Sequence, residues 1–149
     1  MGPRGEGWVV LQAVLLILYA AAPKTGLVWT SPFPTIVGWC FVLAGTGLLV
    51  WSVLNLGSSL TPLPRPRPNG SLVTHGAYGF VRHPIYSAVI IGAAGLGLIT
   101  ENWLRLAITV LLVIFFDSKA RVEERWLEEK YPNYAAYKTR VKKLIPWVY

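Results

Sequence analysis

The sequence predicts an all-α integral membrane protein with about four transmembrane helices. Of its 149 residues, 54% are hydrophobic and only 14% are charged, against about 25% charged in an average soluble domain. The mean hydropathy is +0.48. Apolar runs alternate with short polar segments, and the basic residues collect in two of these segments. We therefore expect a single membrane domain over residues 1–149.

The predicted spans are the apolar runs at residues 8–22, 33–57, 83–100 and 102–116. A bilayer-spanning helix needs roughly 20 residues, so two of these runs are short, and we expect the last helix to continue past Phe116. The first run has an alternative interpretation, because Arg4, an apolar core and small residues at 20–22 are also typical of a secretory signal peptide. Trp8 and Tyr19 flank the run as interface anchors would, and favour a retained span.

The basic residues predict the orientation, because Lys and Arg in short loops favour the cytoplasmic side. The loop 58–82 carries three arginines and no acid, and the tail 117–149 carries eight Lys and Arg. We expect both segments and both termini in the cytoplasm, in a bacterial-type inner membrane or an endomembrane. The net charge of +7 then lies mostly on one face, where it attracts anionic membrane lipids. Nucleic acid is a poor partner, because the basic residues adjoin spans and alternate with acids.

The first polar segment is the loop "SSLTPLPRPRPNGSLVTHGAYGFVRHPIY". Its alternating prolines exclude a helix and predict an extended strap, which ends at the turn Asn69-Gly70. Pro84 suits the first turn of the third span, so Arg82 and His83 would stand at a helix N-terminus that favours an anion. The alternative is that Arg82 anchors the helix among headgroups and that His83 is an ordinary interfacial residue.

The second polar segment follows the fourth span. Residues 117, 121, 124 and 128 would share one helix face, and a tyrosine recurs at every third position from Tyr131 to Tyr137. A basic stretch with an apolar face comes next, which predicts a helical tail lying on the membrane surface as a lid. A solvated charged helix is the alternative.

Other features point to packing. The single Cys40 excludes an internal disulfide, and no His and Cys have metal-ligand spacing, so we expect no metal site. Small residues in the second and third spans favour close helix approach. These residues are Gly38, Gly45, Gly47, Gly92, Gly95 and Gly97.

The two polar segments together resemble the isoprenylcysteine carboxyl methyltransferase family, within the wider group of membrane phospholipid and small-molecule methyltransferases. "GAYGFVRHPIY", followed after a helical hairpin by "RVEERWLEEKYPNYAAYKTRVKKLIP", carries the resemblance, which covers residues 72–146. It implies a cytosolic pocket for S-adenosylmethionine, closed by the tail, and a lipophilic acceptor that enters from the bilayer. By position, the cofactor contacts would be Leu72, Val73, Tyr78, His83, Pro84, Ile85, Tyr86, Glu123 and Glu124.

The resemblance also implies a basic residue before the glutamates that holds the anionic group of the acceptor. Lys119 and Arg121 both fit, and we prefer Arg121 because a guanidinium can bind a carboxylate through two hydrogen bonds. Arg82 would attract the carboxylate of the cofactor. With Arg121 and Arg82 in these catalytic roles, we expect methyl transfer to a carboxylate such as isoprenylcysteine. The alternatives are a phospholipid amine or small thiol as acceptor, an NADPH-dependent reductase of the sterol type, and a non-catalytic membrane adaptor.

Overall fold

The computed structural model describes residues 2, 4–24, 26 and 28–149. Helices are the regular elements of this part of the chain, which confirms the all-α prediction for the described residues. The elements are α1 (Glu6–Ala20), α2 (Phe33–Leu56), the 3-10 turn η1 (Gly57–Ser59), α3 (Ala77–Phe80), α4 (Pro84–Ile99), α5 (Trp103–Lys130) and α6 (Tyr134–Arg140).

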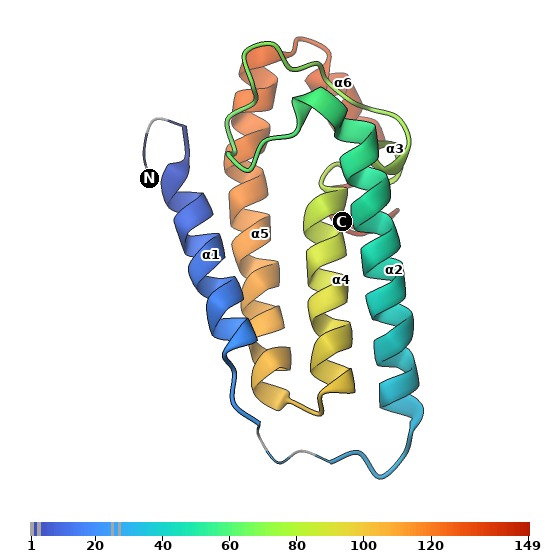
Figure 1. The fold of residues 1–149 in the computed structure, drawn as a ribbon. Helices are drawn as coiled ribbons and strands as arrows, with labels where there is room; N and C mark the ends of the chain where they lie inside the picture. Colours follow the sequence, from blue (N-terminus) through green and yellow to red (C-terminus); the bar gives the residue numbers. More distant parts are fainter. Residues whose placement is uncertain (1, 3, 25, 27) are drawn as a thin grey trace.

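The four long helices lie side by side in the order α1, α5, α4, α2 (Figure 1). Each helix runs antiparallel to the next one along the chain. The connection between α4 and α5 and the one between α1 and α2 therefore lie at one end of the bundle. The loop 58–82, α3 and α6 gather at the other end. Both basic segments thus share one end, as the predicted orientation requires.

Glycines let α2 and α4 approach closely. A Cβ atom built on Gly38 would lie 2.8 Å from the carbonyl oxygen of Gly95, and one built on Gly95 would lie 2.6 Å from that of Gly38. Such contacts are too short for any side chain, so the predicted packing role of these glycines is confirmed. A Cβ atom built on Gly45 would likewise lie 2.9 Å from the backbone nitrogen of Gly92, whereas one built on Gly47 would meet nothing within 4 Å.

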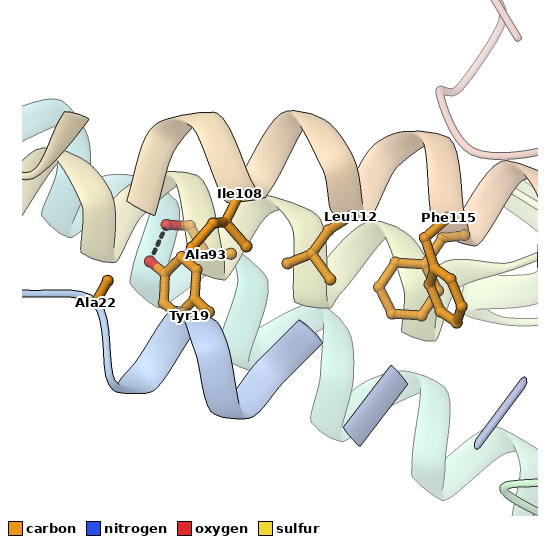
Figure 2. Packing of buried hydrophobic residues seen from close by; sticks show 7 residues of the cluster. Tyr19, Ala22, Ala93, Ile108, Leu112 and Phe115 are labelled. Atoms are coloured by element: carbon orange, nitrogen blue, oxygen red, sulfur yellow. Dashed lines mark hydrogen bonds between the residues drawn. The ribbon is translucent and has the colours of Figure 1, made fainter. Parts of the chain in front are cut away.

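A hydrophobic core joins α1 to the bundle. Tyr19, Ala93, Leu112 and Phe115 belong to this cluster, and the Tyr19 hydroxyl donates a hydrogen bond of 2.5 Å to the Ala93 carbonyl (Figure 2). The Trp8 and Phe115 rings also pack with their centroids 5.7 Å apart. The first apolar run is therefore an integral element of the helical fold.

The outer surface of the bundle is apolar. Large side chains of α2 are more than half exposed, including Ile36, Leu43, Val50 and Leu54. Among the described residues, Phe33–Ser59 is the one helical stretch that is long and apolar enough to cross a membrane, and α1 and α4 are shorter apolar helices. The count of four spans and their orientation stay predictions.

The tail is helical only in part. As predicted, α5 continues beyond Phe116, and it ends at Lys130. Residues 141–149, after α6, form no helix, and an isolated parallel bridge joins Val81 to Lys142. A continuous helical tail is therefore not observed, because this segment uses its backbone to pair with the chain before α4.

Candidate functional site

A cavity of about 330 Å³ opens at the end of the bundle that carries the loop 58–82. That volume lies within the roughly 300 to 1,000 Å³ common for small-molecule sites. Its walls come from the proline-rich strap, the start of α4, the inner side of α5, and α6. The lining includes Gln12, Leu56, Thr61, Pro62, Pro64, Pro66, Leu72, Val73, Tyr78, Arg82, His83, Ile85, Tyr86, Val89, Phe116, Lys119, Glu123, Leu127, Tyr131, Tyr134 and Tyr137.

Residues at the end of α5 hold the strap in place. The Lys130 ammonium donates to the carbonyls of Pro68 at 3.0 Å and Gly70 at 3.3 Å, and the Tyr131 hydroxyl donates to Gly70 at 2.6 Å. The prolines supply no N–H and hinder any helix, so the extended strap leaves these carbonyls free to accept. The strap is thereby fixed as one wall of the cavity.

The tail is joined to the beginning of α4. The Arg82 amide donates to the Lys142 carbonyl at 2.8 Å, and the His83 amide donates to the Lys143 carbonyl at 3.1 Å. One turn later, the Ser87 hydroxyl donates to the Leu144 carbonyl at 2.7 Å. These bonds bring the two polar segments of the sequence together, although about 60 positions separate them.

Glu124 is the centre of a buried ionic network. Its Oε1 atom accepts from Arg82 Nε at 2.8 Å and lies 3.2 Å from His83 Nε2. Burial by itself would raise the pKa of this carboxyl, but the hydrogen bonds from His83 and Arg82 outweigh burial and lower the pKa to about 2. Arg82 also donates to the carbonyls of Lys138 and Val141. Glu124 is therefore ionised at neutral pH, and the network holds α4, α5 and the tail together.

Glu123 has different partners from its neighbour. The Tyr86 hydroxyl donates to Glu123 Oε2 at 2.5 Å, and His83 Nδ1 lies 3.7 Å from the same oxygen. The His83 and Tyr86 rings stack with their centroids 5.2 Å apart. Since Glu123 lines the cavity and Glu124 does not, the first carboxylate is available to a ligand and the second belongs to the wall.

Three tyrosines line the cavity next to this network. Burial raises the pKa of the Tyr78, Tyr134 and Tyr137 hydroxyls, so they remain neutral donors. The Tyr137 hydroxyl donates to the Tyr78 carbonyl at 2.6 Å. Tyr134 is only 1% exposed, and within the described structure its hydroxyl has no hydrogen-bond partner. A buried hydroxyl without a partner is costly, so the Tyr134 hydroxyl is available to donate to a polar group of a ligand or to water.

Lys119 and Arg121 lie on opposite sides of α5. Lys119 is 2% exposed and lines the cavity, where its ammonium donates to Gln12 Oε1 at 2.6 Å and to the Pro62 carbonyl at 3.4 Å. Burial lowers the pKa of Lys119, although Glu123 partly opposes this. Arg121 instead pairs with Asp117 at 2.6 Å, and its side chain is 63% exposed.

The structure brings most of the predicted site residues to one place. The residues that line the cavity are Leu72, Val73, Tyr78, Arg82, His83, Ile85, Tyr86, Lys119 and Glu123. Three do not line it: Pro84 is buried at the start of α4, Glu124 lies in the wall behind it, and Arg121 faces away. Gln12 also lines the cavity and was not among the predicted site residues, although a polar residue within an apolar run is a usual sign of a functional position.

The chain belongs to the phospholipid methyltransferase family, whose sequence profile matches residues 33–134. The cobalt-zinc-cadmium resistance protein CzcN of Cupriavidus metallidurans is 31% identical over 142 residues, which cover 93% of this chain and 61% of that protein. A probable protein-S-isoprenylcysteine O-methyltransferase of Oryza sativa subsp. indica is 31% identical over 120 residues, which cover 78% of this chain and 63% of that protein.

A solved structure of the eukaryotic intramembrane Ras methyltransferase, isoprenylcysteine carboxyl methyltransferase, matches with a TM-score of 0.71. It is 26% identical, and the match covers 99% of this chain and 53% of that chain. The resemblance predicted from the two polar segments is therefore confirmed. The chain spans between about half and two thirds of the length of these relatives.

Proposed function

We propose that this protein is an integral membrane methyltransferase that binds S-adenosylmethionine in the cavity and transfers its methyl group to a lipophilic acceptor. The observation that carries the proposal is the part of the cavity lined by Glu123, Tyr86 and Tyr134, whose hydroxyl has no hydrogen-bond partner among the described residues. The family membership and the methyltransferase relatives support the same reaction class.

The residues of the cavity fit the charges of this cofactor. S-Adenosylmethionine carries a positive sulfonium and ammonium, which the Glu123 carboxylate and tyrosine faces attract. The carboxylate of the cofactor would be attracted by the Arg82 guanidinium, and the Tyr134 hydroxyl can donate a hydrogen bond to one of the carboxylate oxygens. Leu72 and Val73 from the strap end and Ile85 from α4 supply apolar contacts. Pro84 and Glu124 act indirectly, by setting the start of α4 and the position of Arg82.

When bound, S-adenosylmethionine would supply an electrophilic methyl group on the sulfonium. The apolar side chains of Val89, Phe116 and Leu127 exclude water from the space beside it. A dry, closed site strengthens electrostatic attraction and fixes the approach of the acceptor. The tail lowers water access further in this proposal, because Tyr134 and Tyr137 of α6 cover the cavity as a lid.

The acceptor is proposed to be a lipophilic carboxylate, held by Lys119. Lys119 is a buried cation that lines the cavity, whereas the alternative Arg121 lies on the opposite side of α5. A carboxylate acceptor needs no general base, since the nucleophile is already an anion. An amine or a thiol would need one, and Glu123 is the carboxylate in reach.

Ligand-induced thermal stabilisation of the detergent-solubilised protein tests this proposal. A ligand at a hundred times its dissociation constant adds about 2.7 kcal/mol to the free energy of unfolding. We expect S-adenosylmethionine to raise the melting temperature, and NADPH to leave it unchanged. Stabilisation by NADPH alone would favour a reductase, and no shift with either ligand would favour a non-catalytic adaptor. Transfer of labelled methyl to farnesylcysteine, phosphatidylethanolamine or an alkyl thiol then identifies the acceptor class.

The proposed topology places the loop 58–82, the tail and both termini in the cytoplasm, with four spans. Single cysteines at Asn69 and Thr100, both exposed and at opposite ends of the bundle, test it in a Cys40→Ser background. A membrane-impermeant thiol reagent added to intact cells should label Thr100→Cys only. Labelling of both cysteines from the same side would contradict the four-span arrangement.

A further inference from the structure

A second hollow, of about 620 Å³, lies on the side of α5 that faces away from the cavity. It is bordered by α5, α6 and the irregular end of the tail. Six basic residues line it: Arg82, Arg121, Arg125, Lys138, Lys142 and Lys143. Two acidic residues, Glu124 and Glu128, line it as well. Nothing in the proposed methyl transfer uses its exposed part.

Most of these charges are already paired. Lys143 and Arg121 both contact Asp117, at 2.9 and 2.6 Å, and Lys138 contacts Glu128 at 2.8 Å. Within the part of the chain that the structure describes, the side chains of Arg125 and Lys142 have no hydrogen-bond or ion-pair partner. Two unpaired cations beside the same hollow create a position for an anion.

Exposed apolar side chains lie further along the same side of α5, toward its N-terminus. Val110 and Ile114 are each 60% exposed. With 3.6 residues per turn, they share one helix face with Arg121 and Arg125. At the other border, Val148 lines the hollow and is 71% exposed. The surface is therefore basic at the end of α5 and apolar along the part predicted to cross the bilayer.

We propose that this hollow binds the phosphate of an anionic phospholipid, with Arg125 and Lys142 as its main contacts and the acyl chains along Val110 and Ile114. The basic hollow and the apolar side chains follow one another along α5 as the two parts of a lipid do. A lipid headgroup lies at the membrane surface, and its acyl chains extend into the hydrocarbon. A soluble anion would bind to Arg125 and Lys142 alone and would make no contact with the apolar side chains. The inference is independent of the methyl transfer, because it concerns the opposite side of α5.

Native mass spectrometry of the purified protein in detergent tests the proposal. Phosphatidylglycerol, phosphatidylcholine with the same acyl chains, and soluble glycerol phosphate are titrated separately. The Arg125→Gln/Lys142→Gln variant is compared with Arg4→Gln/Arg140→Gln, which also removes two positive charges, from positions just before α1 and at the end of α6 that do not line the hollow. Equal melting temperatures of the three proteins show that the folds are intact.

We expect the wild type to bind phosphatidylglycerol more tightly than phosphatidylcholine. Each basic contact near an anionic lipid contributes roughly a fivefold factor, so the Arg125→Gln/Lys142→Gln variant should lose roughly 30-fold in phosphatidylglycerol affinity. The matched control should stay within about threefold. Wild-type affinity in the Arg125→Gln/Lys142→Gln variant would overturn the site. An equal loss in the Arg4→Gln/Arg140→Gln control would show that the net charge of the protein, and not this hollow, attracts the lipid. Equally tight binding of glycerol phosphate would overturn the assignment of a lipid.

Discussion

The two sides of α5 beyond Phe116 carry similar residues in different surroundings. The inner face, formed by Phe116, Lys119, Glu123 and Leu127, lines the cavity. On the outer face, Arg121, Arg125 and Glu128 border the basic hollow, and Asp117 pairs with Arg121 and Lys143. Both faces contain cations and carboxylates at helical spacing, so the sequence pattern alone does not distinguish them.

Burial makes the difference between the faces. Lys119 on the inner face is 2% exposed, whereas the Arg121 side chain on the outer face is 63% exposed. A charge held away from water interacts strongly with a neighbouring charge, and an exposed one is screened by solvent. We therefore propose Lys119 for the acceptor role on the basis of its burial in the cavity, although a guanidinium has the better geometry for a carboxylate.

Replacing the buried carboxylate of the network should destabilise the protein most. Glu124→Gln leaves Arg82 buried without its ionic partner, and we expect a loss of roughly 3 to 5 kcal/mol in the free energy of unfolding. Glu128→Gln removes an exposed ion pair with Lys138 and should change it by less than about 1 kcal/mol. Denaturant unfolding in detergent measures both values, and equal effects would show that the network contributes no more than the surface pair.

Lys119 and Arg121 should differ sharply in catalysis. If Lys119 holds the acceptor anion, Lys119→Met should lower turnover by an amount equivalent to roughly 2 to 5 kcal/mol with little change in cofactor affinity. Arg121→Ala should lower it by less than about 1 kcal/mol, because the side chain is exposed. Steady-state methyl transfer together with titration of S-adenosylmethionine separates the two roles. The opposite ranking would return the acceptor role to Arg121.

Acid should destabilise the wild type more than Glu124→Gln. The network lowers the pKa of Glu124 from its usual 4.5 to about 2, so its contribution to stability is present above pH 4.5 and is lost as the pH falls from about 4.5 to about 2. Melting temperatures measured over this interval should therefore decline more steeply for the wild type. Parallel curves for the two proteins would contradict the buried ionised state.

The smallest expected effects concern two tyrosines of α6. Tyr134→Phe removes a hydroxyl that has no hydrogen-bond partner among the described residues, so the unfolding free energy should not fall, while the affinity for S-adenosylmethionine should fall by about 1 kcal/mol. Tyr137→Phe loses the hydrogen bond to Tyr78 and should reduce stability by about 1 kcal/mol instead. Calorimetric titration and thermal unfolding measure the two quantities. Unchanged cofactor affinity in Tyr134→Phe would place that hydroxyl outside the site.

Much of the fold could be predicted from the sequence, because it depends on residues that lie close together in the chain. The long apolar runs predicted the helices that are observed as α1, α2, α4 and most of α5, since helix formation depends on residues close together in the chain. Pro84 predicted the start of α4, because a missing N–H is harmless at that position alone. The two polar segments were also found in this way, because prolines, tyrosines and carboxylates are conspicuous beside apolar helices.

The tertiary structure decided which of these polar residues meet in the cavity. Residues 119 and 121 are about 200° apart around the axis of α5, so the rotation of the helix determines which one turns inward. That rotation follows from the packing of Phe115, Phe116 and Leu112 in the core. The same rotation puts Glu123 in the cavity and Glu124 in the wall, and brings Gln12 of α1 to Lys119. Such choices depend on contacts between distant segments, which no local pattern specifies.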